Sequence, residues 1–360
     1  MKNLANADDI QIVKLLRSVL SDSMLPACAG AFVGWNSQEI ALVAPYYKET
    51  ASLPIKLGEK ILWRFRIPSI RLIDSAQSGI RSTEDAEQLI DWLRTSYPRL
   101  AIVFSDVMTD TPLYTAVSKA QAIGFHIINN KPTPHHFHQF KGSYNDFFQK
   151  KSSKYKYRLR KNEKTFAAKF GSDYRIKEYR SRESVSEFLN AANFINKKTY
   201  QYKLFGESVD ESPESMKFYL DLAHGGVFRS FVLWHKARPI CFIVGAQSRS
   251  GIFYYQATGF DPEMRKFAPG INCDILMFRK LYESDRPTML DFGIGDGTYK
   301  RLFANLSKQA ASPILVPRTF NNQFPVHLHK LSVKSNEVAA YVLDRVGVKE
   351  TIKRMVRRSS

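Results

Sequence analysis

The most informative stretch of the sequence reads Phe253-Tyr-Tyr-Gln-Ala-Thr-Gly-Phe-Asp-Pro262 and continues with Arg265-Lys-Phe-Ala-Pro-Gly270. The first part predicts a strand that ends in a loop, and Pro269-Gly270 predicts a helix start. The free amides of a helix start, its positive dipole end and the nearby Arg265 and Lys266 make a site suited to a phosphate. The alternative interpretation is an ordinary connection from a strand to a helix.

Three consecutive strands lead up to this helix. They are predicted at Phe228–His235, Ile240–Gln247 and Gly251–Thr258, and their short connections indicate an antiparallel meander. The elements that follow are a helix at Asn272–Tyr282, a strand at Thr288–Phe292, a helix at Thr298–Leu306 and a strand at Ile314–Pro317. The strand order of such a mixed sheet changes at Thr258–Gly270, and open α/β sheets bind ligands at such points.

Upstream, short helices and strands alternate, which is typical of the α/β class. The predicted elements are helix Ile10–Val19, strands Ile40–Ala44 and Ile61–Phe65, a capped helix from Ser82 or Thr83 to Leu93, strand Ala101–Phe104, helix Leu113–Ala122 and strand Phe125–Ile128. Further predictions are strand Tyr174–Tyr179, helices Val185–Tyr200 and Glu214–Ala223, and one or two helices over Asn336–Arg358.

The composition predicts a folded, soluble, cytoplasmic protein. The chain has 360 residues, of which 44% are hydrophobic, and an apolar fraction of this size excludes a disordered chain. No run approaches the roughly 18 apolar residues of a membrane span, and Asp8 and Asp9 stand where a secretion signal needs an apolar run. Cys28, Cys241 and Cys273 are far apart, and we expect them to be reduced, buried and apolar in role.

The net charge of +19 is concentrated in two segments. Residues 150–164 carry eight bases and one acid, and residues 345–360 carry six bases and one acid. As a helix, the first segment places Tyr155, Leu159, Phe166 and Phe170 on one stripe and spreads its bases over the other side. Two interpretations stay open: a solvated face, or a binding surface for an anionic cofactor, polymer, RNA or membrane.

The run Leu290-Asp-Phe-Gly-Ile-Gly-Asp-Gly-Thr-Tyr-Lys300 is similar to the glycine-rich turn of S-adenosylmethionine-dependent methyltransferases. In that fold the turn follows the first strand, yet only about sixty residues remain here to build a parallel sheet. The next predicted strand, Ile314–Pro317, does not end in an acidic residue that would hold a ribose. Methyl transfer is therefore a minor alternative.

An ordered set of motifs resembles the GNAT-type acetyltransferase family of cellulose and exopolysaccharide biosynthesis, often called CelD or BcsL. The motifs are Tyr144-Asn-Asp-Phe-Phe148, the basic helix with Arg160-Lys-Asn162, Gly259-Phe-Asp-Pro262, Phe267-Ala-Pro-Gly270, and Asp291-Phe-Gly-Ile-Gly-Asp296 with Tyr299-Lys300. The resemblance covers about residues 140–306 and is architectural before that. The usual acyl-CoA loop of simple GNAT enzymes is absent, and Arg265–Gly270 stands in its place.

The resemblance implies a tandem GNAT-like α/β fold with two lobes, related to Fem-type aminoacyl transferases. The implied divisions are a degenerate lobe at 1–140, a basic linker helix at 141–170, an acyltransferase lobe at 171–332 and a basic helical tail at 333–360. It also implies that the strands at Gly251–Thr258 and Thr288–Phe292 splay apart and admit the pantetheine arm of acetyl-CoA or another acyl-CoA. The implied donor-binding residues are Tyr255, Gln256, Thr258, Arg265, Lys266, Pro269, Gly270 and Ile271.

Three residues are candidates for the chemistry. Tyr299 is the candidate general acid toward the departing thiolate, because a phenol with a pKa near ~10 carries a proton at neutral pH; the alternative is a packed tyrosine. Asp296 is either a base or a helix N-cap, and Asp291 is either a base or a buried network carboxylate. Arg158, Lys161 and Lys300 are candidates for binding the acceptor or an anion. Tyr254 and Gln256 share one strand face and Tyr255 has the other, and either can line the cleft.

The histidines raise the question of a metal. His135-His136-Phe-His138 has no carboxylate or cysteine pair at metal-site spacing, so we predict no metal. His327 and His329 alternate as on an exposed edge strand. No Ser-His-Asp order or nucleophilic cysteine context appears, so a covalent acyl-enzyme is not indicated.

The sequence thus predicts an acyl-CoA-dependent N- or O-acetyltransferase. By resemblance, its acceptor is a sugar amine or hydroxyl of a polysaccharide precursor, and its basic segments contact a polysaccharide synthase or the inner membrane surface. Two alternatives stay open: a Fem-like enzyme that uses aminoacyl-tRNA, and a non-catalytic protein associated with a membrane or a complex. No DNA partner is expected.

Overall fold

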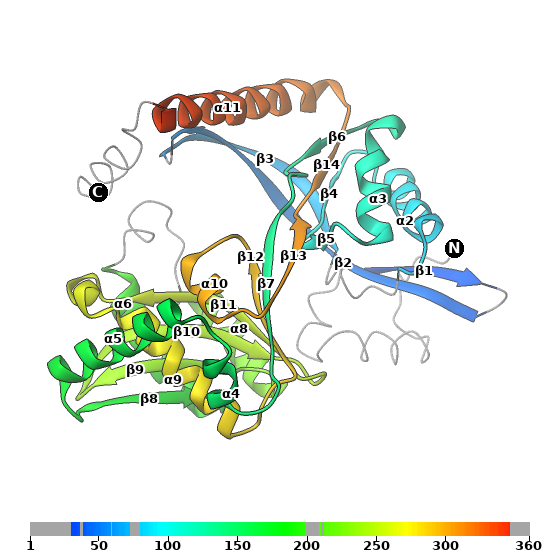
Figure 1. The fold of residues 1–360 in the computed structure, drawn as a ribbon. Coiled ribbons are helices and arrows are strands. Elements are labelled where there is room, and N and C mark those ends of the chain that lie inside the picture. The colour runs from blue at the N-terminus through cyan, green and yellow to red at the C-terminus, as the bar shows by residue number, and fades with distance from the viewer. Residues whose placement is uncertain are drawn as a thin grey trace. The chain divides into compact units, whose positions relative to one another are not determined.

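The computed structural model contains the predicted meander within a mixed sheet (Figure 1). Its strands are β9 (Ser230–His235), β10 (Arg238–Gln247) and β11 (Ile252–Phe260). Both neighbouring pairs are antiparallel, as the short turns predict. The next strand, β12 (Met289–Ile294), runs parallel to β11 after the helix α9 (Pro269–Glu283).

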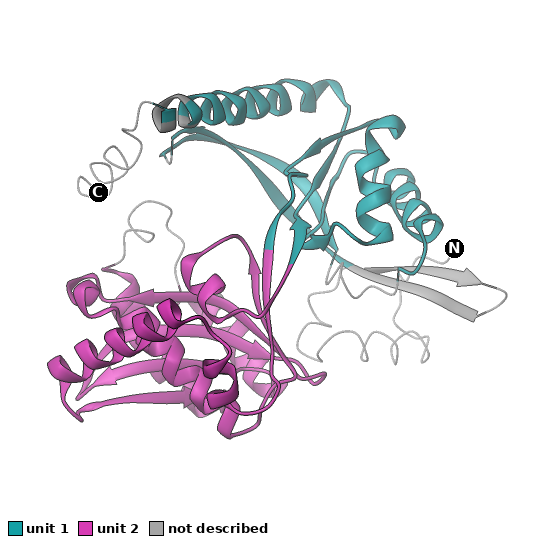
Figure 2. Ribbon diagram, viewed as in Figure 1, with its two compact units in different colours: residues 1–134, 308–359 teal, residues 135–307, 360 magenta. Residues whose placement is uncertain are grey.

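The structure describes residues 30–36, 39–58, 60–72, 80–198, 209 and 212–345. The chain forms two compact units, coloured separately in Figure 2: unit 1 has residues 1–134 and 308–359, and unit 2 has residues 135–307 and 360. The predicted helix near Ile10–Val19, Cys28 and the basic residues after Arg345 lie outside the described residues.

Unit 1 is built on a six-stranded sheet in the order β1-β2-β3-β4-β14-β6. Its elements are β1 (Gly30–Asn36), β2 (Glu39–Leu57), β3 (Lys60–Leu72), α2 (Thr83–Ser96), β4 (Ala101–Val103), β5 (Val107–Met108), α3 (Pro112–Lys119), the 3-10 turn η2 (Ala120–Ile123), β6 (Phe125–Ile128), β14 (Ile314–Pro317) and α11 (Phe320–Arg345). Helix α2 begins at the predicted cap, because Ser82 and Asp85 form a reciprocal capping box. Helices α2 and α3 bury their apolar sides in one core with this sheet.

Unit 2 has helices on both faces of its sheet. Its strands follow the order β7-β12-β11-β10-β9-β8. Its remaining elements are β7 (Thr133–Gln139), α4 (Tyr144–Gln149), α5 (Ser153–Phe170), β8 (Tyr174–Tyr179), η3 (Arg182–Ser184), α6 (Val185–Asn196), α8 (Pro213–His224), η4 (Pro262–Phe267) and α10 (Thr298–Phe303), and the strand β13 (Leu306–Ala311) follows at the boundary between the units. Helices α4, α5 and α9 share a core with one face, and α6 and α8 share a core with the other. Cys241 and Cys273 are buried free thiols, as predicted.

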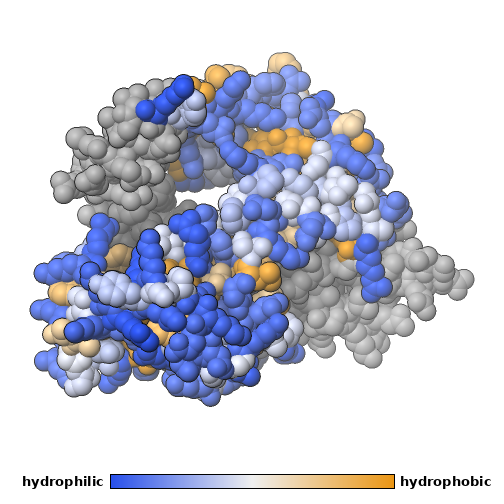
Figure 3. All heavy atoms as spheres, in the orientation of Figure 1, coloured by the Kyte–Doolittle hydropathy of each residue, from blue (hydrophilic) through white to orange (hydrophobic). Residues whose placement is uncertain are grey.

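The basic run forms the amphipathic helix α5. Leu159, Phe166 and Phe170 are buried and Tyr155 packs against the same core, so the predicted apolar stripe is confirmed. Hydrophilic residues dominate the view of unit 2 in Figure 3, where α5 lies on the surface.

The last described segment differs from the prediction. His327 and His329 belong to the helix α11, so the predicted edge strand is wrong. The pattern of burial has the spacing of a helix: Val326 and His329, three positions apart, are buried, while the two residues between them are not. The predicted division after residue 140 lies close to the start of unit 2, whereas the division after residue 332 falls inside α11.

A β-bulge interrupts the pairing of β10 and β11. Gly245 lies opposite Tyr255 and Val244 lies opposite Ala257, which leaves Gln256 without a counterpart. A Cβ atom built on Gly245 would lie 2.7 Å from the carbonyl oxygen of Arg229 and would overlap the Phe253 ring. Because a backbone atom cannot be moved without distorting the sheet, only glycine fits beside the bulge.

Gly245→Ala is expected to destabilise the protein by about 1–3 kcal/mol, since the extra methyl overpacks the sheet beside the bulge. Gly270→Ala is the matched control, because a Cβ there would meet its nearest neighbour, Phe260, at an ordinary 3.6 Å. Urea unfolding of both variants measures the difference. Equal midpoints for Gly245→Ala and the wild type would contradict the assigned contact.

Candidate active site

Strands β11 and β12 part from one another after the first three residues of β11. They are paired through Ile252–Met289, Phe253–Leu290 and Tyr254–Asp291, and these pairs are parallel. Both strands are fully described, and no later residue of β11 pairs with β12. The predicted splay is therefore present.

The bulge at Gln256 comes directly after the last pair of β11 with β12. The residues that follow, Gln256, Ala257 and Thr258, are exposed. A bulge frees backbone groups and bends the strand, and bulges are frequent beside active sites. From Gln256 onward, the edge of β11 that faces β12 therefore has backbone amides that make no ladder hydrogen bonds to β12.

A network around Asp261 holds the turn that leads from β11 to α9. The buried Asp261 carboxylate accepts hydrogen bonds from Lys198 Nζ at 3.1 Å and Arg238 Nη2 at 2.6 Å, and from the backbone amide of Glu263 at 3.1 Å. Burial alone would raise the pKa of Asp261, but the bonds from Arg238 and Lys198 outweigh it and lower the pKa.

The first turn of α9 has no side-chain cap. Its N-cap residue, Ala268, has a φ of 49° and makes no side-chain hydrogen bond to the helix. Arg265 and Lys266 are exposed just before it, while Pro269 is buried and Gly270 and Ile271 are half-buried. The structure thus combines an uncapped helix start with two cations, which is the arrangement that a phosphate group needs.

A buried carboxyl group lies behind the bulge. Asp274 of α9 is 3% exposed, and Tyr255 Oη donates a hydrogen bond of 3.0 Å to its Oδ1. Burial raises the pKa of Asp274 to about 8, so this carboxyl holds a proton at neutral pH. Tyr255 therefore points into the core rather than along the exposed edge.

Two more tyrosines surround this carboxyl group. The ring of Tyr299 lies 5.5 Å from that of Tyr255, and burial followed by the Asp274 charge raises the pKa of Tyr299 to about 12. Burial also raises the pKa of Tyr155, whose buried hydroxyl has no hydrogen-bond partner among the described residues. Tyr299 thus keeps its phenolic proton over the whole physiological range, as a general acid must.

Two histidines of β7 meet the two carboxylates that the sequence singled out. His135 Nε2 is hydrogen-bonded to Asp291 Oδ1 at 2.5 Å, and the same oxygen accepts the Gly293 amide at 2.7 Å. His136 Nε2 is hydrogen-bonded to Asp296 Oδ1 at 3.0 Å. The sequence analysis considered these histidines only as possible metal ligands. It could not pair them with Asp291 and Asp296, because β7 and β12 are far apart in the sequence and meet only in the folded sheet.

Asp296 is not the predicted helix cap. The N-cap of α10 is Gly297, which has no side chain to offer, and Asp296 instead bonds His136 and, through Oδ2, Arg301 Nη1 at 2.5 Å. The hydrogen bond from His136, with Arg301 adding to it, lowers the pKa of Asp296. Asp296 is exposed, so it is an ionised carboxylate within reach of solvent.

The other members of these motifs are structural. His138 Nδ1 donates to the Phe303 carbonyl and Nε2 accepts from Tyr282, and burial lowers the pKa of His138 to about 4. Lys300 is buried, and its Nζ donates to the carbonyls of Gly293 at 3.1 Å and Ile294 at 2.7 Å. The described residues contain no group of three His, Cys, Asp or Glu side chains placed to hold a metal.

Lys300 therefore braces the glycine-rich turn rather than facing a ligand. Gly293 and Gly295 have φ values of 70° and 110°, which favour glycine. The backbone conformation of the turn therefore accounts for both glycines, and no bound nucleotide is needed to explain them. On α5, by contrast, Arg158 and Lys161 are exposed and face solvent.

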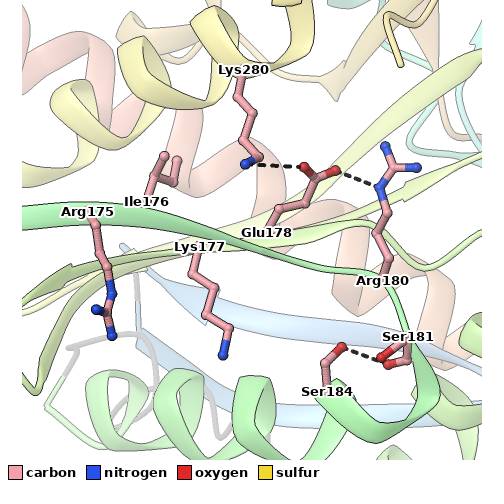
Figure 4. Close-up of a pocket in the computed structure, with 8 residues that line it drawn as sticks. All are labelled: Arg175, Ile176, Lys177, Glu178, Arg180, Ser181, Ser184 and Lys280. Carbon is pink, nitrogen blue, oxygen red and sulfur yellow. Dashed lines mark hydrogen bonds and ion pairs between the residues drawn. The ribbon is translucent and has the colours of Figure 1, made fainter. Parts of the chain in front are cut away.

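A shallow hollow along the edge strand β8 is lined by bases and carries no comparable chemistry (Figure 4). Its central Glu178 bonds Arg180 at 2.6 Å and the buried Arg229 at 2.8 Å, and Lys280 lies 3.8 Å away. Lys177 pairs with Glu187. Because Glu178 and Glu187 already pair with these four bases, the hollow is a surface ion-pair network.

Comparison with known proteins identifies the class. Residues 153–301 match the family model described as an acetyltransferase (GNAT) domain. The match includes β11, β12, α9 and Tyr299. The predicted α/β class with GNAT-like lobes and the predicted enzyme class are confirmed.

Two solved structures resemble nearly the whole chain. One, described as FemX, has a TM-score of 0.54 at 11% identity and covers 86% of this chain and 92% of its own. A conserved protein of unknown function from Bacteroides thetaiotaomicron VPI-5482 has a TM-score of 0.51 at 10% identity and covers 82% and 88%. At such identities the likeness concerns the fold alone. No curated protein sequence matches the chain.

Asp274→Asn is expected to make stability less dependent on pH. The folded state keeps a proton on Asp274 up to about pH 8, whereas the unfolded chain releases it near the ordinary pKa of 3.8. The free energy of unfolding of the wild type therefore falls as the pH rises through this window. Asparagine keeps an acceptor for Tyr255 but does not titrate. The free energy of unfolding of Asp274→Asn is therefore expected to increase relative to that of the wild type from pH 5 to pH 8.

Melting temperatures of both proteins across this pH range provide the measurement. Asp221→Asn is the control, because Asp221 lies on the surface, paired with Lys217. A difference between Asp274→Asn and the wild type that stays constant with pH would show that Asp274 is ionised in the folded state.

Proposed function

We propose that unit 2 transfers an acyl group from acyl-CoA, with acetyl-CoA as the first candidate, to an amine or hydroxyl group. The observation that carries this proposal is the parting of β11 and β12 at the bulge of Gln256. An extended thioester arm fits such an edge, where the freed amides bind the thioester oxygen and stabilise its developing negative charge. Arg265, Lys266 and the start of α9 then hold the phosphates.

The transfer is a direct attack. The acceptor nitrogen or oxygen bonds to the thioester carbon, the carbon–sulfur bond breaks, and the sulfur takes the phenolic proton of Tyr299. Asp296, oriented by His136, accepts the proton of the nucleophile, and Asp291 with His135 is the second candidate for this role. Arg158 and Lys161 of α5 are proposed to attract an anionic acceptor.

The CelD/BcsL resemblance supports a polysaccharide precursor as the acceptor and a cytoplasmic location, with a degenerate first lobe at 1–140, a linker helix at 141–170, a catalytic lobe at 171–332 and a tail at 333–360. A second candidate function, Fem-like transfer from aminoacyl-tRNA, is favoured by the fold likeness to FemX and by the exposed bases of α5. In that case the RNA backbone would occupy the surface of α5.

A panel of acetyl-CoA, CoA, S-adenosylmethionine and tRNA in thermal-shift assays separates these functions. Acetyl-CoA and CoA are expected to raise the melting temperature, since a ligand that binds only the folded state stabilises it. A salt-sensitive shift with tRNA and none with CoA would instead support the Fem-like function. A shift with S-adenosylmethionine alone would support methyl transfer.

Ala257→Trp is expected to abolish the shift with acetyl-CoA, because the exposed Ala257 lies on the unpaired edge of β11 and an indole there obstructs it. Ala122→Trp, at an exposed position of unit 1, is the matched control and should keep the shift. If both variants respond like the wild type, the donor binds elsewhere.

Tyr299→Phe is expected to lower kcat by about a hundredfold, the usual contribution of a general acid, while the Kd for CoA stays nearly unchanged. Tyr157→Phe changes an exposed tyrosine of α5 and should leave both quantities unaltered. Equal losses of turnover and CoA binding in Tyr299→Phe would remove the general-acid assignment.

A further inference from the structure

Helix α11 of unit 1 has an apolar stripe on its solvent side. Phe320, Phe324, Leu331 and Val338 are 91%, 68%, 61% and 57% exposed. At about 100° per residue these four side chains lie within an arc of about 40° on the helix. Figure 3 shows hydrophobic residues among hydrophilic ones over this helix.

The opposite side of α11 is fixed against the β2/β3 hairpin, so the stripe is not available for the core of unit 1. Val326 is fully buried, and His329 Nδ1 donates to the Pro54 carbonyl at 2.8 Å. Ser332 and Asn336 add hydrogen bonds to the backbone of Lys56. These contacts set the rotation of the helix about its axis.

The stripe continues onto the hairpin through a row of aromatic rings. Phe324 meets Phe65 edge to face at 6.1 Å between centroids, and Phe65 meets Trp63 at 6.5 Å. Trp63 is 63% exposed. We call the surface formed by Trp63, Phe320, Phe324, Leu331 and Val338 the α11 face.

Lys330 and Lys334 flank the apolar stripe on α11, and the β2/β3 hairpin beside it is also basic, although Arg64 and Arg66 lie on the strand face opposite Trp63 and Phe65. Residues 56–66 and 330–337 together contain six bases and two acids. The bases are Lys56, Lys60, Arg64, Arg66, Lys330 and Lys334, and all are exposed. Of the acids, Glu337 is paired with Lys131. Two copies of so basic a surface repel one another, whereas an anionic surface attracts it.

Exposed aromatic and aliphatic residues flanked by bases are the pattern of helices that lie in the plane of a membrane surface. None of the described helices has the length and apolar composition to cross a bilayer. We propose that the α11 face binds the surface of a bilayer that contains anionic phospholipids, with Trp63 and the apolar stripe in the headgroup region. This surface belongs to unit 1 and is independent of the acyl-transfer proposal.

Co-sedimentation with vesicles of phosphatidylcholine, with and without phosphatidylglycerol, tests the proposal. The full chain is expected to bind the vesicles with phosphatidylglycerol, and less so at high salt. Phe320→Ser/Leu331→Ser and, separately, Lys330→Glu/Lys334→Glu should each lower the partition coefficient at least about tenfold. All four positions are exposed, so the melting temperatures should stay unchanged.

The matched control reverses two charges on a different basic surface, in Arg158→Glu/Lys161→Glu of α5, and should bind vesicles nearly as the wild type does. Loss of binding in this control alone would overturn the proposal and assign the contact to α5. Failure of the wild type to bind either vesicle would also overturn it. So would a lipid-free dimer in light scattering that Phe320→Ser/Leu331→Ser dissociates, because the occupant would then be a second copy.

Discussion

The site depends on one constraint on the backbone: β11 cannot stay paired with β12 once it has passed the bulge. The extra residue, Gln256, bends the strand away from the last shared pair, Tyr254–Asp291. Gly245 of the neighbouring strand lies opposite Tyr255 at this bulge, and a side chain there would meet the carbonyl oxygen of Arg229 and the ring of Phe253. The close packing beside the bulge therefore needs a glycine in β10.

Local signals in the sequence were sufficient for much of unit 2. Three strand-like segments with short connections predicted the meander, and Pro269 predicted the start of α9. The basic helix α5 followed from its apolar stripe. The interpretation of Asp296 as a cap was wrong because its partner, His136, lies 160 residues away in the chain, and no local pattern reports such a contact.

Asp274 was missed for a different reason. It stands among apolar residues in α9, and a lone acid within the buried side of a helix is a signal that the sequence does contain. What the sequence does not show is that the hydroxyl of Tyr255 lies within hydrogen-bonding distance of this acid, which makes its burial tolerable. In α11, the helical spacing of Val326 and His329 is hidden by Pro325 and by the alternation of two histidines, a pattern that favours a strand.

The strand order of unit 1 has a consequence for how the chain is made. Strand β14 lies between β4 and β6, although almost two hundred residues separate it from β6 in the sequence. The first sheet thus remains incomplete on the ribosome while the whole of residues 135–307 is synthesised and emerges. During that time β4 and β6 lack the strand that joins them, and their unpaired edges are open to wrong partners. Rapid, autonomous folding of the inserted segment would shorten this period and bring the two halves of the first sheet together.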